Sequence, residues 1–143
     1  MNKGRNNLIV FLGTTPNIGT TVVSFGTAKM LAEKTEQSIA YLCLNLKSSK
    51  IHRYLGIDQP AVTLDEIRPQ IKLRTLTVDR LRSCCHKVKT TSGLHVMFGN
   101  TMRDQAEFYT PEDVEYLLHT ASSAFDLCIA EVNAYWDNAA TVF

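Results

Sequence analysis

The 143-residue sequence lacks several features that mark specialised classes of protein. Its 15 Lys and Arg nearly balance 14 Asp and Glu, so the net charge is +1 and the basic excess typical of nucleic-acid binders is missing. No apolar run approaches the roughly 20 residues that a membrane-spanning helix needs. The four cysteines form no Cys-x-x-Cys pair, which argues against a zinc site or a disulfide framework. We therefore expect a cytoplasmic protein that holds neither zinc nor haem.

Two histidine-containing segments deserve a structural interpretation before a functional one. Cys84, Cys85 and His86 are consecutive, but adjacent cysteines rarely bind one ion together, so we expect packing or surface roles for them. His95 falls within an apolar run. We expect it to be a core histidine with its hydrogen bonds satisfied, or a residue at the edge of a sheet.

Four short apolar runs divide the chain, at residues 8–12, 38–44, 94–98 and 127–130. Each is apolar throughout and does not alternate with polar residues. This pattern is typical of strands buried on both faces, as in a parallel sheet that is covered by helices.

Helical segments are expected between these runs. Residues 20–34 place apolar side chains, Val23 and Met30 among them, on one side of a helix, which predicts the buried face. A second helix is expected to start at Thr110 and Pro111, because threonine is a good N-cap and proline suits the first helical position.

Shorter helices are expected near residues 63–67 and 78–85. The alternation of strands and helices predicts an α/β fold, a three-layer doubly wound and mainly parallel sheet. The length predicts a single domain over residues 1–143.

The segment at residues 13–21 joins the first strand to the first helix. In α/β folds this position binds phosphate, because free N–H groups and the helix dipole face the loop. Of the glycine, lysine and hydroxyl positions of a P-loop, only Gly19 and Thr21 match, with Thr14 and Thr20 in place of the first glycine and the lysine. The alternative is a strand–helix turn that binds no ligand.

The sequence from Gly13 to Val23 nevertheless resembles the deviant Walker A loop and first helix of the MinD/ParA family of P-loop NTPases. Thr15 stands where that family has its signature lysine, and Thr20 stands at the second lysine. The TadZ/CpaE-like branch, whose members serve pilus assembly and localisation, is the subgroup it resembles most.

The resemblance continues along the chain to the Walker B strand, at residues 125–131. Cys43 and Asn45 stand at the two switch aspartates, and Glu131 stands at the Walker B aspartate. The family pattern implies that Thr21 and Glu131 would hold Mg²⁺ if a nucleotide binds. The residues that it implies for the nucleotide are Asn17, Ile18, Gly19, Thr20 and Thr21. It also implies that the chain is the N-terminal portion of a larger domain, cut after the Walker B strand.

Both phosphate-binding cations are therefore missing, so the resemblance implies a pseudo-ATPase. ATP and Mg²⁺ remain possible ligands, but tight binding is not expected. The function implied is a non-catalytic or weakly nucleotide-responsive scaffold in subcellular positioning or assembly, with protein partners and a homodimer. The alternative is an active ATP-dependent dimer switch of the partition or localisation type, and binding to nucleic acid is not expected.

Overall fold

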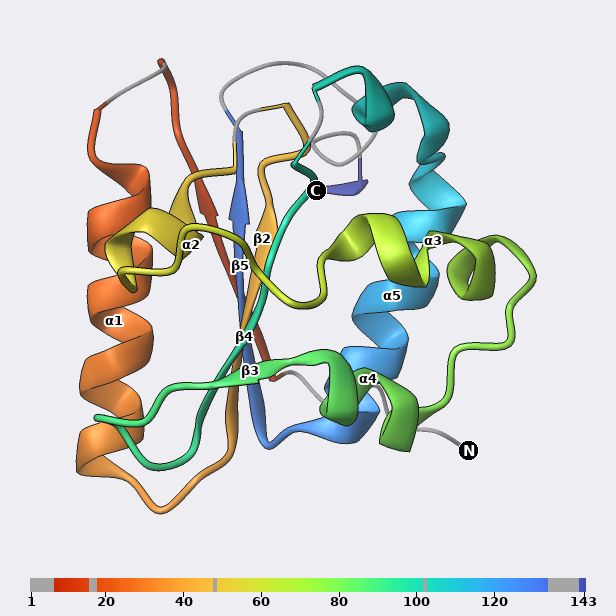
Figure 1. Ribbon diagram of the computed structural model, residues 1–143. Helices are drawn as coiled ribbons and strands as arrows, with labels where there is room; N and C mark the ends of the chain where they lie inside the picture. Colours follow the sequence, from red (N-terminus) through yellow and green to blue (C-terminus); the bar gives the residue numbers. More distant parts are fainter. Residues whose placement is uncertain (1–6, 16–17, 48, 102, 134–141) are drawn as a thin grey trace.

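The computed structural model describes residues 7–15, 18–47, 49–101, 103–133 and 142–143. It has three layers, with a central sheet between one helical layer that contains a long helix, residues 20–34, and a second helical layer on the other face (Figure 1). This confirms the predicted α/β sandwich. No helix in the described part of the chain is long and apolar enough to cross a membrane.

The sheet has five strands in the order β1-β5-β2-β4-β3, and four of them run parallel. Their bounds are β1 Leu8–Leu12, β2 Ile39–Leu44, β3 His86–Lys87, β4 Leu94–Met97 and β5 Leu127–Val132. All four apolar runs therefore form strands. The short β3, which pairs antiparallel with β4 at one edge, was not expected from the sequence.

In the described ranges, five α-helices and one 3₁₀ helix connect the strands. Their bounds are α1 Thr20–Lys34, α2 Ile51–Tyr54, α3 Leu64–Lys72, α4 Val78–Cys84, η1 Arg103–Phe108 and α5 Pro111–Ala124. Helix α1 covers one face of the sheet, and α3, α4 and α5 lie on the other side (Figure 1). The predicted N-terminus of α5 is confirmed: Thr110 caps it, Pro111 opens it, and Asp113 completes a capping box.

Strand β1 differs from the prediction that it is buried on both faces. It pairs only with β5 and lies at the edge of the sheet, and Leu12 at its end is 57% exposed. By contrast, every residue of β2, between β5 and β4, is buried. Hydrophobicity alone does not distinguish an edge strand from a central one, which is why the sequence placed both in the core.

The predicted buried face of α1 was wrong for two of its large side chains, whereas Leu31 of that face does pack against the core. Val23 and Met30 are 58% and 54% exposed. The helix instead lies on the sheet through small side chains, those of Ser24, Ala28 and Ala32. Large side chains of the sheet, Tyr41 among them, lie beneath α1, so small residues at the centre of the contact let the helix approach closely, and Phe25 packs beside them, partly buried.

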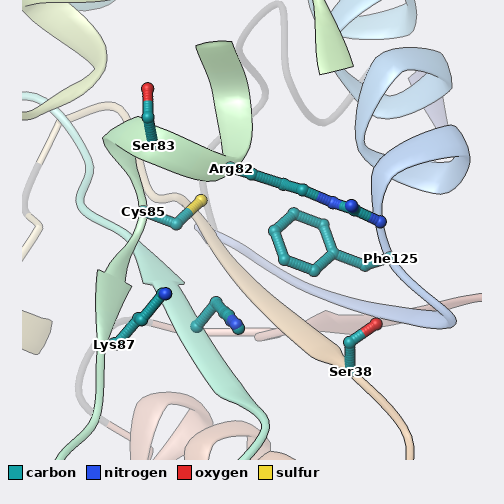
Figure 2. Close-up of a pocket in the computed structure, with 7 residues that line it drawn as sticks. Ser38, Arg82, Ser83, Cys85, Lys87 and Phe125 are labelled. Carbon is teal, nitrogen blue, oxygen red and sulfur yellow. The ribbon is translucent and has the colours of Figure 1, made fainter. Parts of the chain in front are cut away.

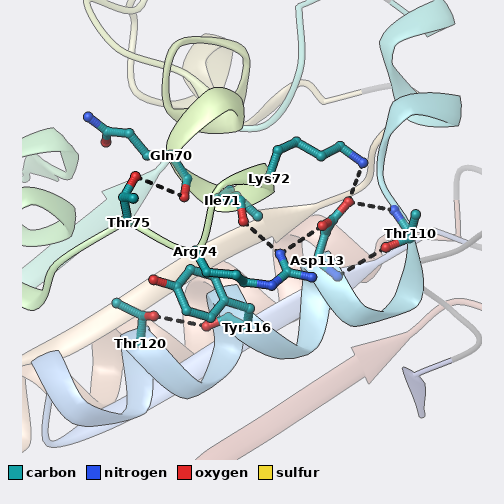
Figure 3. Close-up of polar contacts among 9 residues, drawn as sticks. All are labelled: Gln70, Ile71, Lys72, Arg74, Thr75, Thr110, Asp113, Tyr116 and Thr120. Carbon is teal, nitrogen blue, oxygen red and sulfur yellow. Dashed lines mark hydrogen bonds and ion pairs between the residues drawn. The ribbon is translucent and has the colours of Figure 1, made fainter.

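On the other side of the sheet, the junction of α3 and α5 is built around one carboxylate. Asp113 is only 3% exposed and forms ion pairs with Lys72 and with Arg74, the latter at 2.8 Å (Figure 3). Its Oδ2 also accepts from the backbone N–H of Thr110 at 2.9 Å. Burial opposes ionisation, but the bonds from Lys72, Thr110 and Arg74 outweigh it and lower the pKa of Asp113 to about 2.

Candidate functional site

The candidate site lies at the carboxyl ends of β1, β5 and β2, where the loop from β1 enters α1 (Figure 1). Gly19 is the N-cap residue of the helix, with a positive φ of 90°, and it has no side chain with which to cap the first turn. A left-handed backbone of this kind favours glycine. The first N–H groups of α1 have no acceptor within the helix, so they are available to an anion.

Glu131 of β5 is the centre of the site. It is 3% exposed and lies beside Phe11 of β1 and Cys43 of β2 in the sheet register. Thr21 of α1 donates its hydroxyl to Oε1, and Tyr41 of β2 donates to Oε2 at 2.6 Å. The structure thus brings together Thr21 and Glu131, the two residues that the sequence proposes as Mg²⁺ ligands.

Tyr41 and Ser24 belong to this network and were missed by the sequence reasoning. The Ser24 hydroxyl lies 2.9 Å from the Tyr41 hydroxyl, and the Tyr41 ring packs edge-on against Phe25. Burial, with Cys43 and Glu131 nearby, raises the pKa of Tyr41 far above its usual range, so it stays a donor. One signal was available: Tyr41 is two residues before Cys43 and therefore shares its face of the strand.

Cys43 lies within the same network but cannot supply a thiolate at neutral pH. Its Sγ is 3.2 Å from the Ser49 hydroxyl and 4.0 Å from Glu131 Oε2. Burial first, and then the charge of Glu131, raise the pKa of Cys43 to about 12. A protonated thiol is a poor nucleophile and a poor metal ligand, so Cys43 does not replace the chemistry of an aspartate.

The remaining predicted residues take different positions around the loop. Thr15 and Ile18 are exposed, and Asn45 is partly buried just after β2. The Thr20 hydroxyl packs so closely on Gly13 that a Cβ there would come within 2.7 Å of it. Thr20 is thus turned back onto the start of the loop. Asn17 lies outside the described residues.

The oxygen donors fit Mg²⁺ in kind. This ion prefers carboxylate and hydroxyl oxygens and keeps several of its waters, and Thr21 and Glu131 provide one donor group of each type. No group of three or more His, Cys, Asp or Glu able to hold a metal ion occurs in the described ranges. The further ligands of a Mg²⁺ ion here would be water or the oxygens of a bound phosphate.

Neither a protein-family model nor a curated protein sequence matches the chain. Solved structures do. A ParA family ATPase from Chlorobium tepidum superposes with a TM-score of 0.81 at 17% identity, over 95% of this chain and 55% of that one. The fold is that of ParA-family ATPases.

Two further structures agree with this fold. A plasmid partition protein of Borrelia burgdorferi B31, bound to AMPPNP, gives a TM-score of 0.69 at 11% identity over 95% of this chain and 56% of its own. The kinase domain of the Escherichia coli tyrosine kinase ETK gives 0.69 at 19% identity, over 93% and 48%. The chain thus spans about half the length of these proteins, and because partition ATPases and a tyrosine kinase share the fold, the fold alone does not fix the activity.

Proposed function

We propose that the chain is a degenerate ParA/MinD-type P-loop protein that acts as a scaffold in subcellular positioning or assembly, with little or no ATP hydrolysis. What carries the proposal is the charge of the site. The loop from Gly13 to Thr21 contains no Lys or Arg. Among the described residues, Glu131 has hydroxyl partners and no ion pair.

Phosphoryl transfer depends on cations that stabilise the charge of the transferred group, because the protein does little covalent chemistry. Thr15 and Thr20 occupy the two lysine positions of the family pattern and offer hydrogen bonds without charge. Removal of one preorganised donor commonly costs on the order of 3 kcal/mol of transition-state stabilisation. With two charges absent, hydrolysis falls towards the uncatalysed rate.

Binding of ATP is a separate matter from its hydrolysis. The free N–H groups of the first turn of α1 can still bind a phosphate, and Thr21 with Glu131 would hold Mg²⁺ through oxygen ligands. The ion would supply charge neutralisation. We propose weak, Mg²⁺-dependent nucleotide binding, in keeping with the AMPPNP-bound partition protein of the same fold.

The partners that we propose are proteins, with a second copy of the chain among them. A role like that of the TadZ/CpaE-like branch, in pilus assembly or localisation, agrees with a site that keeps its fold and loses its catalytic charges. The near-neutral net charge of +1 gives no support to binding of nucleic acid.

One observation favours a second candidate function, an active ATP-dependent dimer switch. Thr21 and Glu131, the two proposed Mg²⁺ ligands, lie in direct contact. An active site would need that pair intact, so the contact is compatible with a switch that obtains its cations from elsewhere, such as a partner subunit.

Phosphate release from ATP separates these two functions. We expect the purified chain with ATP and Mg²⁺ to release phosphate no faster than the buffer, and Thr21→Ala to change nothing. Ser122→Ala, a hydroxyl removed from α5 on the other side of the sheet, controls for contaminating ATPases. Phosphate release that disappears in Thr21→Ala and persists in Ser122→Ala would establish the active switch instead.

A further inference from the structure

A pocket of about 590 Å³ lies at the amino ends of β2 and β5 (Figure 2). The loop between β1 and α1 lies at the other end of the strands, where their carboxyl ends meet. Ser38 immediately precedes β2, and Phe125 comes just before β5. The other lining residues come from α4 and its C-cap, from β3 and from β4, and are Arg82, Ser83, Cys85, Lys87 and His95.

Three basic side chains converge on this pocket from three different elements. Lys87 of β3 and His95 of β4 are directly opposite each other in the antiparallel register, which places them on one face of the sheet. Arg82 approaches from α4 (Figure 2). Neither Lys87 nor Arg82 has an ion pair within the part of the chain that the structure describes.

Arg82 is held in position before any ligand arrives. Its Nε donates to the backbone carbonyl of Ala124 at 2.6 Å, Nη2 donates to the same oxygen, and the guanidinium lies 5.9 Å from the centre of the Phe125 ring. These contacts leave Nη1 unused. A guanidinium that is fixed in this way loses little entropy when it binds an anion.

One ring nitrogen of His95 is buried. Its Nδ1 has no hydrogen-bond partner among the residues that the structure describes, and its ring packs against Phe125 at 5.1 Å. Of the two alternatives expected for His95, a histidine with satisfied hydrogen bonds is therefore not met at Nδ1, and the other, a residue near the edge of the sheet, agrees with the pairing of β4 to the edge strand β3. Burial, followed by the charges of Lys87 and Arg82, lowers the pKa of His95, in agreement with two cationic side chains near the ring.

Asp126, which follows the lining residue Phe125 in the chain, is hydrogen-bonded to another lining residue, Ser38. Asp126 Oδ2 accepts from the backbone N–H of Ser38 at 2.8 Å and from its hydroxyl at 3.0 Å. The Ser83 hydroxyl donates to the backbone carbonyl of Arg80 within its own helix. The groups that remain for a ligand are therefore Arg82, Lys87 and His95.

We propose that this pocket binds a small phosphate dianion, at a site independent of the nucleotide loop. The charges of Arg82 and Lys87 match the two charges of the dianion, and Arg with Lys is a common pair of phosphate-binding residues. The free volume and the apolar sides of Phe125 and Cys85 leave room for an organic group, so the phosphate is either free or carried by a monoester.

Two-dimensional NMR of the 143-residue chain tests this site, with inorganic phosphate and phenyl phosphate as separate probes. We expect saturable shifts at the amides of Arg82, Lys87 and His95 with both probes. Tighter binding of phenyl phosphate would identify a monoester site, and equal binding a site for free phosphate. Shifts confined to Gly19 and Thr21 would place all binding in the nucleotide loop and would overturn the proposal.

A matched pair of variants shows whether phosphate binding depends on the pocket or only on the total positive charge of the chain. Lys87→Ala is expected to weaken phosphate binding about tenfold, the effect of one charge-assisted hydrogen bond. Lys89→Ala removes the same charge from an exposed position two residues away that does not line the pocket, and should leave the affinity within about twofold. Equal losses in the two variants would overturn the proposal.

The pKa of His95 gives an independent readout. Sulfate, which stays a dianion over the relevant pH range, is expected to raise the pKa of His95 because it offsets the repulsion from Lys87 and Arg82. Sulfate should also bind more tightly as the pH falls and His95 becomes charged. A His95 pKa that does not respond to sulfate would contradict the assignment.

Discussion

Two buried carboxylates, on opposite sides of the same sheet, have very different surroundings. Asp113 and Glu131 are each 3% exposed. Asp113 is paired with two cations, Lys72 and Arg74. Glu131 is bonded to the hydroxyls of Thr21 and Tyr41. A charge that is neutralised within the fold serves structure, whereas a buried carboxylate that is bonded to uncharged hydroxyl and thiol groups can still attract a cation from outside.

Among the substitutions that test this comparison, we expect replacement of Asp113 to lower the free energy of unfolding the most. Asp113→Asn leaves Lys72 and Arg74 without their partner and weakens the capping box at α5, so we expect a loss of about 3 kcal/mol in the free energy of unfolding. Urea denaturation measures this loss. Glu112→Gln, at the exposed neighbouring position, is the control, and an equal loss there would contradict the assignment.

The contribution of Asp113 to the free energy of unfolding should also depend on pH. The pKa of Asp113 is lowered to about 2 in the folded protein, so its contribution is complete above the pKa of an unfolded aspartate and is lost as the pH falls towards 2. We expect about 2 kcal/mol to be lost between roughly pH 5 and pH 2. Unfolding of Asp113→Asn over this range should lack that component. Parallel curves for the two proteins would show that another group titrates.

Tyr41→Phe tests the hydroxyl bonds to Glu131. Loss of a donor to a buried carboxylate should cost about 2 kcal/mol, because bonds to charged groups are the stronger ones. Tyr116→Phe is a matched control: its hydroxyl donates to the neutral carbonyl of Leu76 at 3.0 Å, and we expect a loss of about 1 kcal/mol. Thermal unfolding measures the loss of stability in each variant. A larger loss in Tyr116→Phe than in Tyr41→Phe would contradict the prediction.

Glu131→Gln should have the smallest effect on stability. Glutamine keeps an acceptor for one hydroxyl and removes a buried charge that has no cation, so we expect a change below about 1 kcal/mol in either direction. The contrast with Asp113→Asn is the decisive comparison. If both substitutions destabilise equally in urea, Glu131 has a structural role like that of Asp113.

The sequence predicted the elements well, because their signals are local. The cap at Thr110 and Pro111 defines the start of α5, and the continuous apolar runs define the strands. The orientation of α1 is not a local property. Its residues are apolar on more than one side, and the choice of Ser24 and Ala28 over Val23 depends on the bulk of Tyr41 beneath them.

The candidate site was predicted only in part, for a related reason. Thr21 and Glu131 were found by resemblance to a known pattern, and the structure places them in contact. Tyr41 and Ser24 join them only because β2 lies between β5 and β4. Strand order is not a local signal, so a tyrosine within an apolar run was interpreted as core.

Calorimetric titration with ATP and Mg²⁺ tests most directly whether the absence of charge in the loop limits nucleotide binding. We predict weak binding by the wild-type chain and at least about tenfold tighter binding by Thr20→Lys, which restores one cation at the loop. Thr27→Lys adds the same charge farther along α1 and should leave the affinity unchanged. Tight binding by the wild type, with no gain from Thr20→Lys, would contradict the prediction.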